Sequence, residues 1–440
     1  MRALLPVAAV FVVLAAGCGG SSRHAVSTQT ETAPPTTATA PTAATTTTTA
    51  TAPTTTPTTE RPPTTTETTT KAATTTQPKP KPKTDPKLIV GAVEDAAKYS
   101  TRPRAQMKLA RASGFRAIVL SAVWETGASA AADLPALQRA AAAAVAEGIR
   151  PVVAIYQFSS STPADPARRR AFVAYAAALA KALPQVRDVI IGNEPNLNLF
   201  WQPQFDDSGS DEAARDYEVL LAAAYDRLKE QDPGMDVIGG ALAPHGGDRP
   251  SSRPTHSPTQ FIRDLGAAYR ASGRTKPIMD ALSLHVYGDS QHTPPSFAHP
   301  RSTTIGIADY GKVVTLLRDA FGGTAQPGAS LPIVYGEYGV ETAIPHDKAY
   351  LYTGREVTSP VDEETQARFY DEAIRMAEAQ PTVRMLFLFH VVDETRLEGL
   401  QSGTRYADGS PKASEAPVRR TLEAAADKTI TAADARAGGR

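Results

Sequence analysis

Cysteine is nearly absent from this sequence: its 440 residues include a single one, Cys18. A single cysteine excludes an internal disulfide, a cysteine-rich zinc site and thiol–disulfide chemistry. An excess of charge is also missing, because 46 basic residues balance 46 acidic ones. A nucleic-acid-binding protein would show a basic excess, so no nucleic-acid partner is expected. What is present, 41% hydrophobic and 21% charged residues, is typical of a globular protein.

Metal-binding motifs are missing as well. No His-Glu-x-x-His pattern occurs anywhere in the chain, and no His-x-His follows its first apolar run after the N-terminal region. These are the patterns in which hydrolases commonly hold zinc. The sequence therefore predicts neither a metal ion nor another cofactor.

The first 17 residues have the pattern of a secretory signal peptide. Arg2 precedes an apolar run over residues 4–16, which is too short to span a membrane. The segment 14–18, Leu-Ala-Ala-Gly-Cys, resembles the lipobox of bacterial lipoproteins, except that Ala15 stands where leucine is usual. The resemblance implies a lipid on Cys18 and an extracytoplasmic location at the cell membrane. An ordinary signal peptide, giving a secreted protein, is the alternative.

Residues 18–86 form a segment of very biased composition. Between positions 31 and 80, 25 of the 50 residues are threonine and 9 are proline. Such a segment cannot bury enough apolar surface to offset its ordering entropy, so it is expected to be a disordered linker. Repeated Thr and Pro also suit an O-glycosylated stalk. We interpret it as a tether between the anchor and a folded domain.

From Lys87 onward, short apolar runs alternate with helical stretches. The helical stretches include 135–146, 166–183 and 212–231. Near-continuous apolar runs are typical of strands buried on both faces. The eight runs cover 88–93, 117–120, 151–156, 189–192, 237–242, 281–286, 333–336 and 385–389.

Eight strands joined by helices predict an α/β fold, a (β/α)8 TIM barrel over residues 87–425. Residues 426–440 are expected to be a disordered tail. The alternative is an open doubly wound sheet. Against it, the first run ends in Gly-Ala-Val-Glu at 91–94 and lacks the glycine-rich phosphate turn of such folds.

Two glutamates directly follow apolar runs. Glu194 lies in Gly-Asn-Glu-Pro after the fourth run, and Glu337 lies in Tyr-Gly-Glu-Tyr-Gly directly after the seventh. The carboxyl ends of barrel strands carry the catalytic residues of TIM-barrel enzymes, and strands four and seven face each other across the mouth. Two opposed carboxylates suit glycosidic bond cleavage, in which one donates a proton and the other attacks the anomeric carbon.

With these motifs, residues 87 to about 425 resemble the retaining glycoside hydrolases of the large (β/α)8 clan that includes the cellulase-like families. The resemblance implies that Glu194 is the acid/base and Glu337 the nucleophile. It also implies that Asn193 binds the sugar 2-hydroxyl and that Tyr287, in His285-Val286-Tyr287, hydrogen-bonds the nucleophile. The end of the eighth run departs from the pattern, because His390 stands where many clan members have a tryptophan.

Other side chains after the strands are candidates for contact with a sugar. Pyranose C–H faces pack on flat apolar rings, so Trp124 and Trp201 are predicted to bind substrate, together with His285 and His390. Tyr156 is an aromatic candidate for the same surface. The remaining histidines, 245, 256, 292, 299 and 346, lie in polar loops and are expected to be solvated.

Three functions remain open. The first is a membrane-anchored, monomeric glycoside hydrolase that cleaves a poly- or oligosaccharide with retention. The second is a non-catalytic carbohydrate- or cell-wall-binding lipoprotein on the same barrel. The third, a solute-binding lipoprotein, needs two lobes and a hinge, of which the eight-unit pattern gives no sign.

Overall fold

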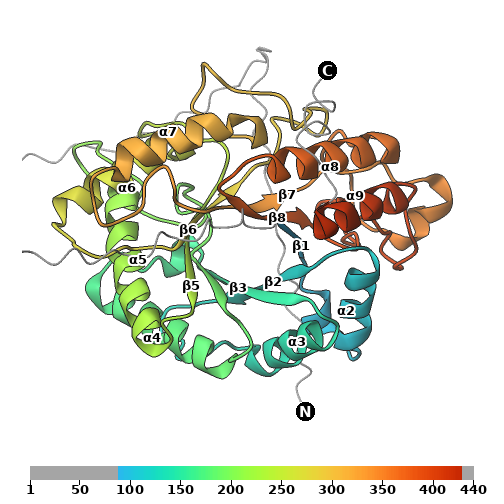
Figure 1. Cartoon of the computed structure of the whole chain (residues 1–440), viewed down its shortest axis with the longest axis horizontal. Helices are drawn as coiled ribbons and strands as arrows, with labels where there is room; N and C mark the ends of the chain where they lie inside the picture. The colour runs from blue at the N-terminus through green and yellow to red at the C-terminus, as the bar shows by residue number, and fades with distance from the viewer. Residues whose placement is uncertain (1–87, 429–440) are drawn as a thin grey trace, which may run out of the picture. The chain divides into compact units, whose positions relative to one another are not determined.

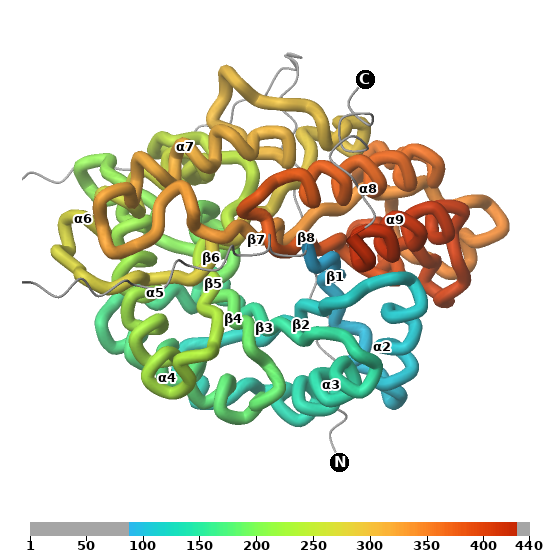
Figure 2. Tube along the Cα trace, in the orientation of Figure 1, coloured from blue at the N-terminus to red at the C-terminus, as the bar shows by residue number. Residues whose placement is uncertain are grey.

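Eight parallel strands close into a barrel in sequence order, which confirms the predicted fold. The computed structural model describes residues 88–428. β1 pairs with β2 and also with β8, and this last pairing closes the sheet, so the two ends of the folded chain lie side by side (Figure 2). The strands are β1 (Ile89–Val93), β2 (Ala117–Val123), β3 (Arg150–Tyr156), β4 (Asp188–Ile191), β5 (Asp236–Leu242), β6 (Ala281–His285), β7 (Ile333–Tyr338) and β8 (Val383–Phe389).

The helices surround the barrel on the outside (Figure 1). Several begin at a side chain that satisfies the free backbone N–H groups: Asp165, Asp211, Ser257 and Asp362 each accept such a bond. The helices are α1 (Ala96–Tyr99), α2 (Pro103–Ala112), α3 (Leu134–Ala146), α4 (Pro166–Ala182), α5 (Glu212–Gln231), α6 (Pro258–Ala271), α7 (Tyr310–Phe321), α8 (Glu363–Glu378) and α9 (Glu415–Asp427). Short 3-10 turns occupy Ser159–Ser161, Ile307–Asp309 and His346–Leu351.

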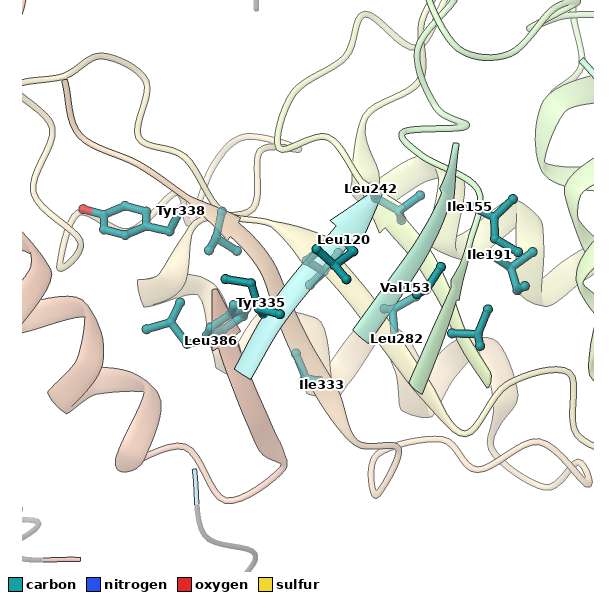
Figure 3. Close-up of a cluster of buried hydrophobic side chains, with 14 of the residues drawn as sticks. Leu120, Val153, Ile155, Ile191, Leu242, Leu282, Ile333, Tyr335, Tyr338 and Leu386 are labelled. Atoms are coloured by element: carbon teal, nitrogen blue, oxygen red, sulfur yellow. The ribbon is translucent and has the colours of Figure 1, made fainter. Parts of the chain in front are cut away.

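Strand side chains alternate between two buried layers. In β2, Val119 belongs to the cluster that fills the barrel interior, whereas Ile118 and Leu120 belong to the layer beneath the helices. In β3, Val153 likewise packs in this outer layer, part of which Figure 3 shows. Both faces of each strand are therefore apolar, which is why the runs in the sequence are continuous instead of alternating.

Charged residues close the amino-terminal end of the barrel. Asp188 is fully buried at the start of β4 and accepts two hydrogen bonds from Arg150 of β3, at 2.6 and 2.9 Å. Arg384 of β8 reaches across to Asp236 of β5, with Nη1 3.1 Å from the carboxylate. Because these ion pairs occupy the amino-terminal end, a site is expected at the opposite, carboxyl-terminal end of the barrel.

The predicted signal peptide, Cys18, the linker and most of the predicted tail lie outside the described residues. α9 ends at Asp427, two residues past the expected end of the barrel domain at 425. Among residues 88–428, no helix combines the length and apolar composition that a membrane span requires.

Candidate active site

Glu194 is placed at the barrel mouth by an irregular turn after β4. Gly192 and Glu194 both have positive φ angles, 82° and 38°. The backbone N–H of Glu194 donates to the carbonyl oxygen of Ala241 at 2.9 Å. Ala241 is itself strained, with a φ of 50°, at the irregularity in the pairing of β5 with β6. Non-glycine residues held at positive φ cost energy and cluster at functional sites, so both the position and its strain point to function.

Glu337 lies within β7, opposite His285 of β6. The pairing of these strands shifts register between Leu284 and His285, which brings His285 level with Glu337. The residue before it, Gly336, has no room for a side chain, because an added Cβ would overlap Ser283 Oγ and approach the His285 ring. The glycine in this motif therefore lets the two strands seat His285 against Glu337.

His285 joins the two glutamates. Its Nδ1 lies 2.8 Å from Glu194 Oε1, to which it donates a hydrogen bond, and 3.4 Å from Glu337 Oε2. The imidazole is almost completely buried. The structure thus brings Glu194 and Glu337 together at one end of the barrel, on either side of a single ring nitrogen.

Two tyrosines hold the carboxylate of Glu337. Tyr287 donates to Oε2 at 3.0 Å, as the sequence resemblance implied. Tyr156, at the end of β3, donates to Oε1 at 3.2 Å. Sequence reasoning placed Tyr156 near the site as an aromatic surface and missed this hydrogen bond. The available signal was its position as the last, inward-facing residue of a strand next to β4.

Burial dominates the electrostatics of Glu337. It raises the pKa of this carboxyl above its usual value of 4.5, and the charge of Glu194 acts in the same direction. His285, Tyr287 and Tyr156 oppose the shift. Burial also lowers the pKa of His285, but the charges of Glu337 and Glu194 outweigh it and the net shift is upward. The carboxylates therefore raise the pKa of His285, while His285 opposes the rise in the pKa of Glu337.

Asn193 lies directly before Glu194 and is almost fully buried. Its carbonyl oxygen accepts a hydrogen bond from Gln157 Nε2 at 3.1 Å. Its side-chain oxygen, Oδ1, has no hydrogen-bond partner within residues 88–428. A buried amide oxygen normally has a donor, so Asn193 Oδ1 is an exception next to Glu194.

The two tryptophans do not line the site. Trp124 and Trp201 are both 0% exposed. Trp124 packs edge-on against Phe172 of α4, and Trp201 packs against Tyr217 of α5. The prediction that they form flat sugar-binding surfaces is wrong, because each ring is enclosed between a loop and a helix of the outer layer. A tryptophan that follows a strand can satisfy the same sequence pattern by closing the core beneath the loop.

His390 occupies the end of β8 in a left-handed backbone conformation, with a φ of 77°. Its Nε2 lies 3.3 Å from Glu394 Oε1 and its Nδ1 lies 3.9 Å from Glu94 Oε2. Phe389, the residue before it, packs edge-on against Tyr287. The end of β8 is therefore beside the residues that hold Glu337, and substrate contact by His390 stays a prediction.

A buried ion pair in the segment after β8 forms hydrogen bonds to the loop after β7. Lys412 Nζ lies 2.8 Å from Asp393 Oδ1, and both side chains are fully buried. Lys412 also donates to Thr342 Oγ1 at 2.7 Å, and Tyr352 donates to Asp393 Oδ2 at 2.7 Å. The segment after Glu337 is thus fixed on one side of the barrel mouth.

Comparison with known proteins supports the fold assignment. No protein-family model and no curated protein sequence matches the chain. The structure is similar to GH5_18 from Streptomyces cattleya in complex with GlcNAc, with a TM-score of 0.53, 15% identity and coverage of 79% of this chain and 82% of that one. A single-residue variant of that protein in complex with Manb1-4GlcNAc gives a TM-score of 0.51 and 15% identity, with coverage of 77% of this chain and 80% of that one.

A third structure, the GH39 enzyme from Xanthomonas axonopodis pv. citri, gives a TM-score of 0.49 and 18% identity. The match covers 76% of this chain but 65% of that enzyme, just under two thirds of its length. These structural neighbours are glycoside hydrolases, and the two GH5_18 structures, with TM-scores above 0.5, show the shared barrel fold.

Proposed function

We propose that this chain is a retaining glycoside hydrolase. The observation that carries the proposal is the placement of Glu194 and Glu337 on either side of His285 Nδ1. Glu194 Oε1 lies 2.8 Å and Glu337 Oε2 lies 3.4 Å from that nitrogen, so these two oxygens are no more than about 6 Å apart. Carboxyl groups about 5–5.5 Å apart are typical of retaining enzymes, whereas inverting enzymes need about 6.5–9.5 Å to admit a water molecule.

In the first step, Glu337 attacks the anomeric carbon while Glu194 gives its proton to the leaving oxygen, so the glycosidic bond breaks as a glycosyl ester forms on Glu337. In the second step, Glu194 removes a proton from water, and the water oxygen displaces Glu337 from the sugar. Tyr156 and Tyr287 hold the Glu337 carboxylate in position for attack, since each donates to a different oxygen. By the resemblance of its motif, Asn193 is assigned the contact to the sugar 2-hydroxyl.

A screen for turnover separates this proposal from a carbohydrate-binding lipoprotein. The chain is incubated with aryl β-glycosides and with plant and microbial glucans, xylans and mannans, and the release of aryl alcohol or reducing ends is measured. An enzyme gives release that depends on Glu337. A binding protein gives affinity for a glycan without release, and that result would contradict the proposal.

The hydrogen bond from Tyr287 is expected to set the lower pH limit of activity. Because Tyr287 favours the charged form of Glu337, Tyr287→Phe raises the pKa of Glu337 further. Activity falls as pH drops through this pKa, so the acid limb of kcat/KM moves to higher pH by about one unit, the size of one hydrogen bond to a charged group.

The matched control is Tyr335→Phe, which removes a buried hydroxyl from the same strand as Glu337. Tyr335 donates to Gln380 on the outer side of the barrel and belongs to the layer under the helices. Its pH profile should equal that of the wild type. An unmoved acid limb in Tyr287→Phe, in a variant that is still active, would show that this bond does not control Glu337.

We further propose that Cys18 carries a lipid and holds the enzyme on the outer side of the cell membrane. The support is the apolar run and the Leu-Ala-Ala-Gly-Cys segment, together with the Thr/Pro-rich residues that follow. Cys18→Ser should move the protein from the membrane fraction to the medium or another soluble extracytoplasmic fraction. Unchanged membrane association of this variant would contradict lipidation.

A further inference from the structure

A second group of ionisable side chains lies behind the loop that carries Glu194. Asp211 caps the N-terminus of α5, His256 ends the loop after β5, and Asp264 lies in α6. One ligand atom from each of the three lies within 4.8 Å of the others. Three separate elements therefore direct an imidazole and two carboxylates to one point.

His256 is buried, with 1% of its surface exposed, so the expectation that it is solvated is wrong. His299, for which the same was expected, is also buried and pairs with Asp309 at 2.7 Å. His256 differs because acceptors surround its Nε2: the carbonyl oxygen of Gln204 lies at 2.9 Å and Asp211 Oδ1 at 3.3 Å. Because both of these neighbours are oxygen acceptors, His256 Nε2 must either carry a proton or bind a cation.

The carboxylates of this group have too few positive partners. Asp211 Oδ2 is buried and has no hydrogen-bond partner within the described chain. Asp264 accepts only from the amide of Gln260, at 2.9 and 3.1 Å, among the hydrogen bonds of residues 88–428. In that same range, no lysine or arginine forms an ion pair with Asp211 or Asp264, and the nearby Arg215 is paired with Asp206 and Glu212.

One oxygen of Asp211, Oδ1, accepts a hydrogen bond from Ala214 N–H at 2.8 Å, so the other, Oδ2, is the one that lacks a donor among residues 88–428. Two carboxylates this close inside a protein need a cation or a shared proton between them.

We propose that Asp211, His256 and Asp264 bind a divalent metal ion, Zn²⁺ by the type of donors, with a water molecule as the fourth ligand. Imidazole nitrogen and carboxylate oxygen are both ligands that zinc accepts. Zinc bonds of about 2.0–2.2 Å in a tetrahedron place neighbouring ligand atoms about 3.3–3.6 Å apart. The observed 3.3 Å between His256 Nε2 and Asp211 Oδ1 matches this spacing. Binding at Nε2 leaves the ring proton on Nδ1.

This metal joins the loops that follow β4 and β5. Gln204 Nε2 donates to the carbonyl oxygen of Pro195, the residue after Glu194. The Asn196 side chain bonds Ala243 and the carbonyl oxygen of His256. A cation here therefore fixes the wall of the barrel mouth from which Glu194 extends. The binding of the metal does not depend on the proposed hydrolase activity.

The test measures metal content and stability of the full chain, purified without an affinity tag or chelator. Elemental analysis should find about one zinc or other divalent metal per chain, and EDTA followed by desalting should remove it. Removal should lower the melting temperature by about 5 °C or more, and ZnCl₂ should restore it, because a ligand that binds only the folded state stabilises it.

Asp264→Asn should lose both the metal and the response to zinc. Asp207→Asn is the matched control, since Asp207 is exposed in the loop that precedes α5 and should leave both unchanged. If Asp264→Asn does not fold, the proposal is tested by the wild type alone, through the change in its melting temperature when the metal is removed and added back. The proposal would be overturned if the purified wild type contained no metal and its melting temperature did not change with EDTA, Zn²⁺, Mn²⁺ or Ca²⁺. The two carboxylates would then share a proton.

Discussion

Replacing Glu337 with glutamine is expected to reduce hydrolysis by at least about 10³-fold, because the covalent route has no nucleophile without this carboxylate. Glutamine keeps the size of the side chain and leaves an oxygen that Tyr156 or Tyr287 can still contact. The loss should therefore fall on kcat, with the affinity for substrate nearly unchanged. Initial rates on whichever glycoside the screen identifies, with binding measured by calorimetry, test this expectation.

Glu341→Gln is the matched control for this variant. Glu341 is also a buried carboxylate that follows β7, but it accepts its hydrogen bonds from Gln291 at 2.9 Å and Thr358 at 3.2 Å, away from His285. Its replacement should change activity far less than that of Glu337. Equal losses of activity in both variants would indicate that a buried charge near β7 is needed only for folding. Full activity in Glu337→Gln would contradict the proposed mechanism.

Replacing Glu194 with glutamine should give the second-largest loss, about 10²–10⁴-fold on substrates with a poor leaving group, because the proton donor is gone. Substrates whose leaving group is already acidic, such as dinitrophenyl glycosides, need no proton in the first step. For them the glycosyl ester should form at a nearly normal rate and accumulate, since Glu194 is also the base that activates water.

Azide distinguishes this role from a structural one. A small anionic nucleophile needs no base, so azide should accelerate turnover of dinitrophenyl substrates by Glu194→Gln and yield a glycosyl azide with the configuration of the substrate. The wild type should show no such acceleration. A Glu194→Gln variant that loses activity equally on all leaving groups and does not respond to azide would refute the acid/base assignment.

Much of the fold was predictable because both faces of the barrel strands are buried. That burial imposes continuous apolar runs, such as 151–156, and β3 indeed covers Arg150–Tyr156. The helix predicted over 212–231 matches α5 residue for residue, since Asp211 provides an N-cap before its apolar face. The proximity of Glu194 and Glu337 could be predicted from the topology, because residues at the carboxyl ends of parallel strands in a closed barrel lie at the same rim.

What the sequence did not predict depends on which way a loop side chain turns. Trp201 and Trp124 follow strands, as sugar-binding rings do, yet fold back under the loops against α5 and α4. His256 lies among polar and proline residues in the sequence, but the loops after β4 and β5 enclose it. These outcomes depend on contacts between loops distant in sequence, which no local pattern encodes.

The electrostatics of Glu337 show the same limit. Tyr287 was expected to hydrogen-bond Glu337, and that bond does favour the ionised form of the carboxyl group. Burial is the larger effect, however, and the net shift of the pKa is upward. In the proposed reaction, the charge of His285 and the two tyrosine hydroxyls compensate for part of this burial when Glu337 ionises.

The most direct test is to trap the glycosyl group on the protein and locate it by mass spectrometry. A 2-deoxy-2-fluoro aryl glycoside of the sugar identified in the screen slows the second step more than the first, so the ester should persist. We expect one glycosyl group per chain, found on the peptide that contains Glu337, and a product of retained configuration by NMR. Turnover with inverted configuration, or a glycosyl group attached to any other residue, would contradict the assignment of Glu337 as nucleophile.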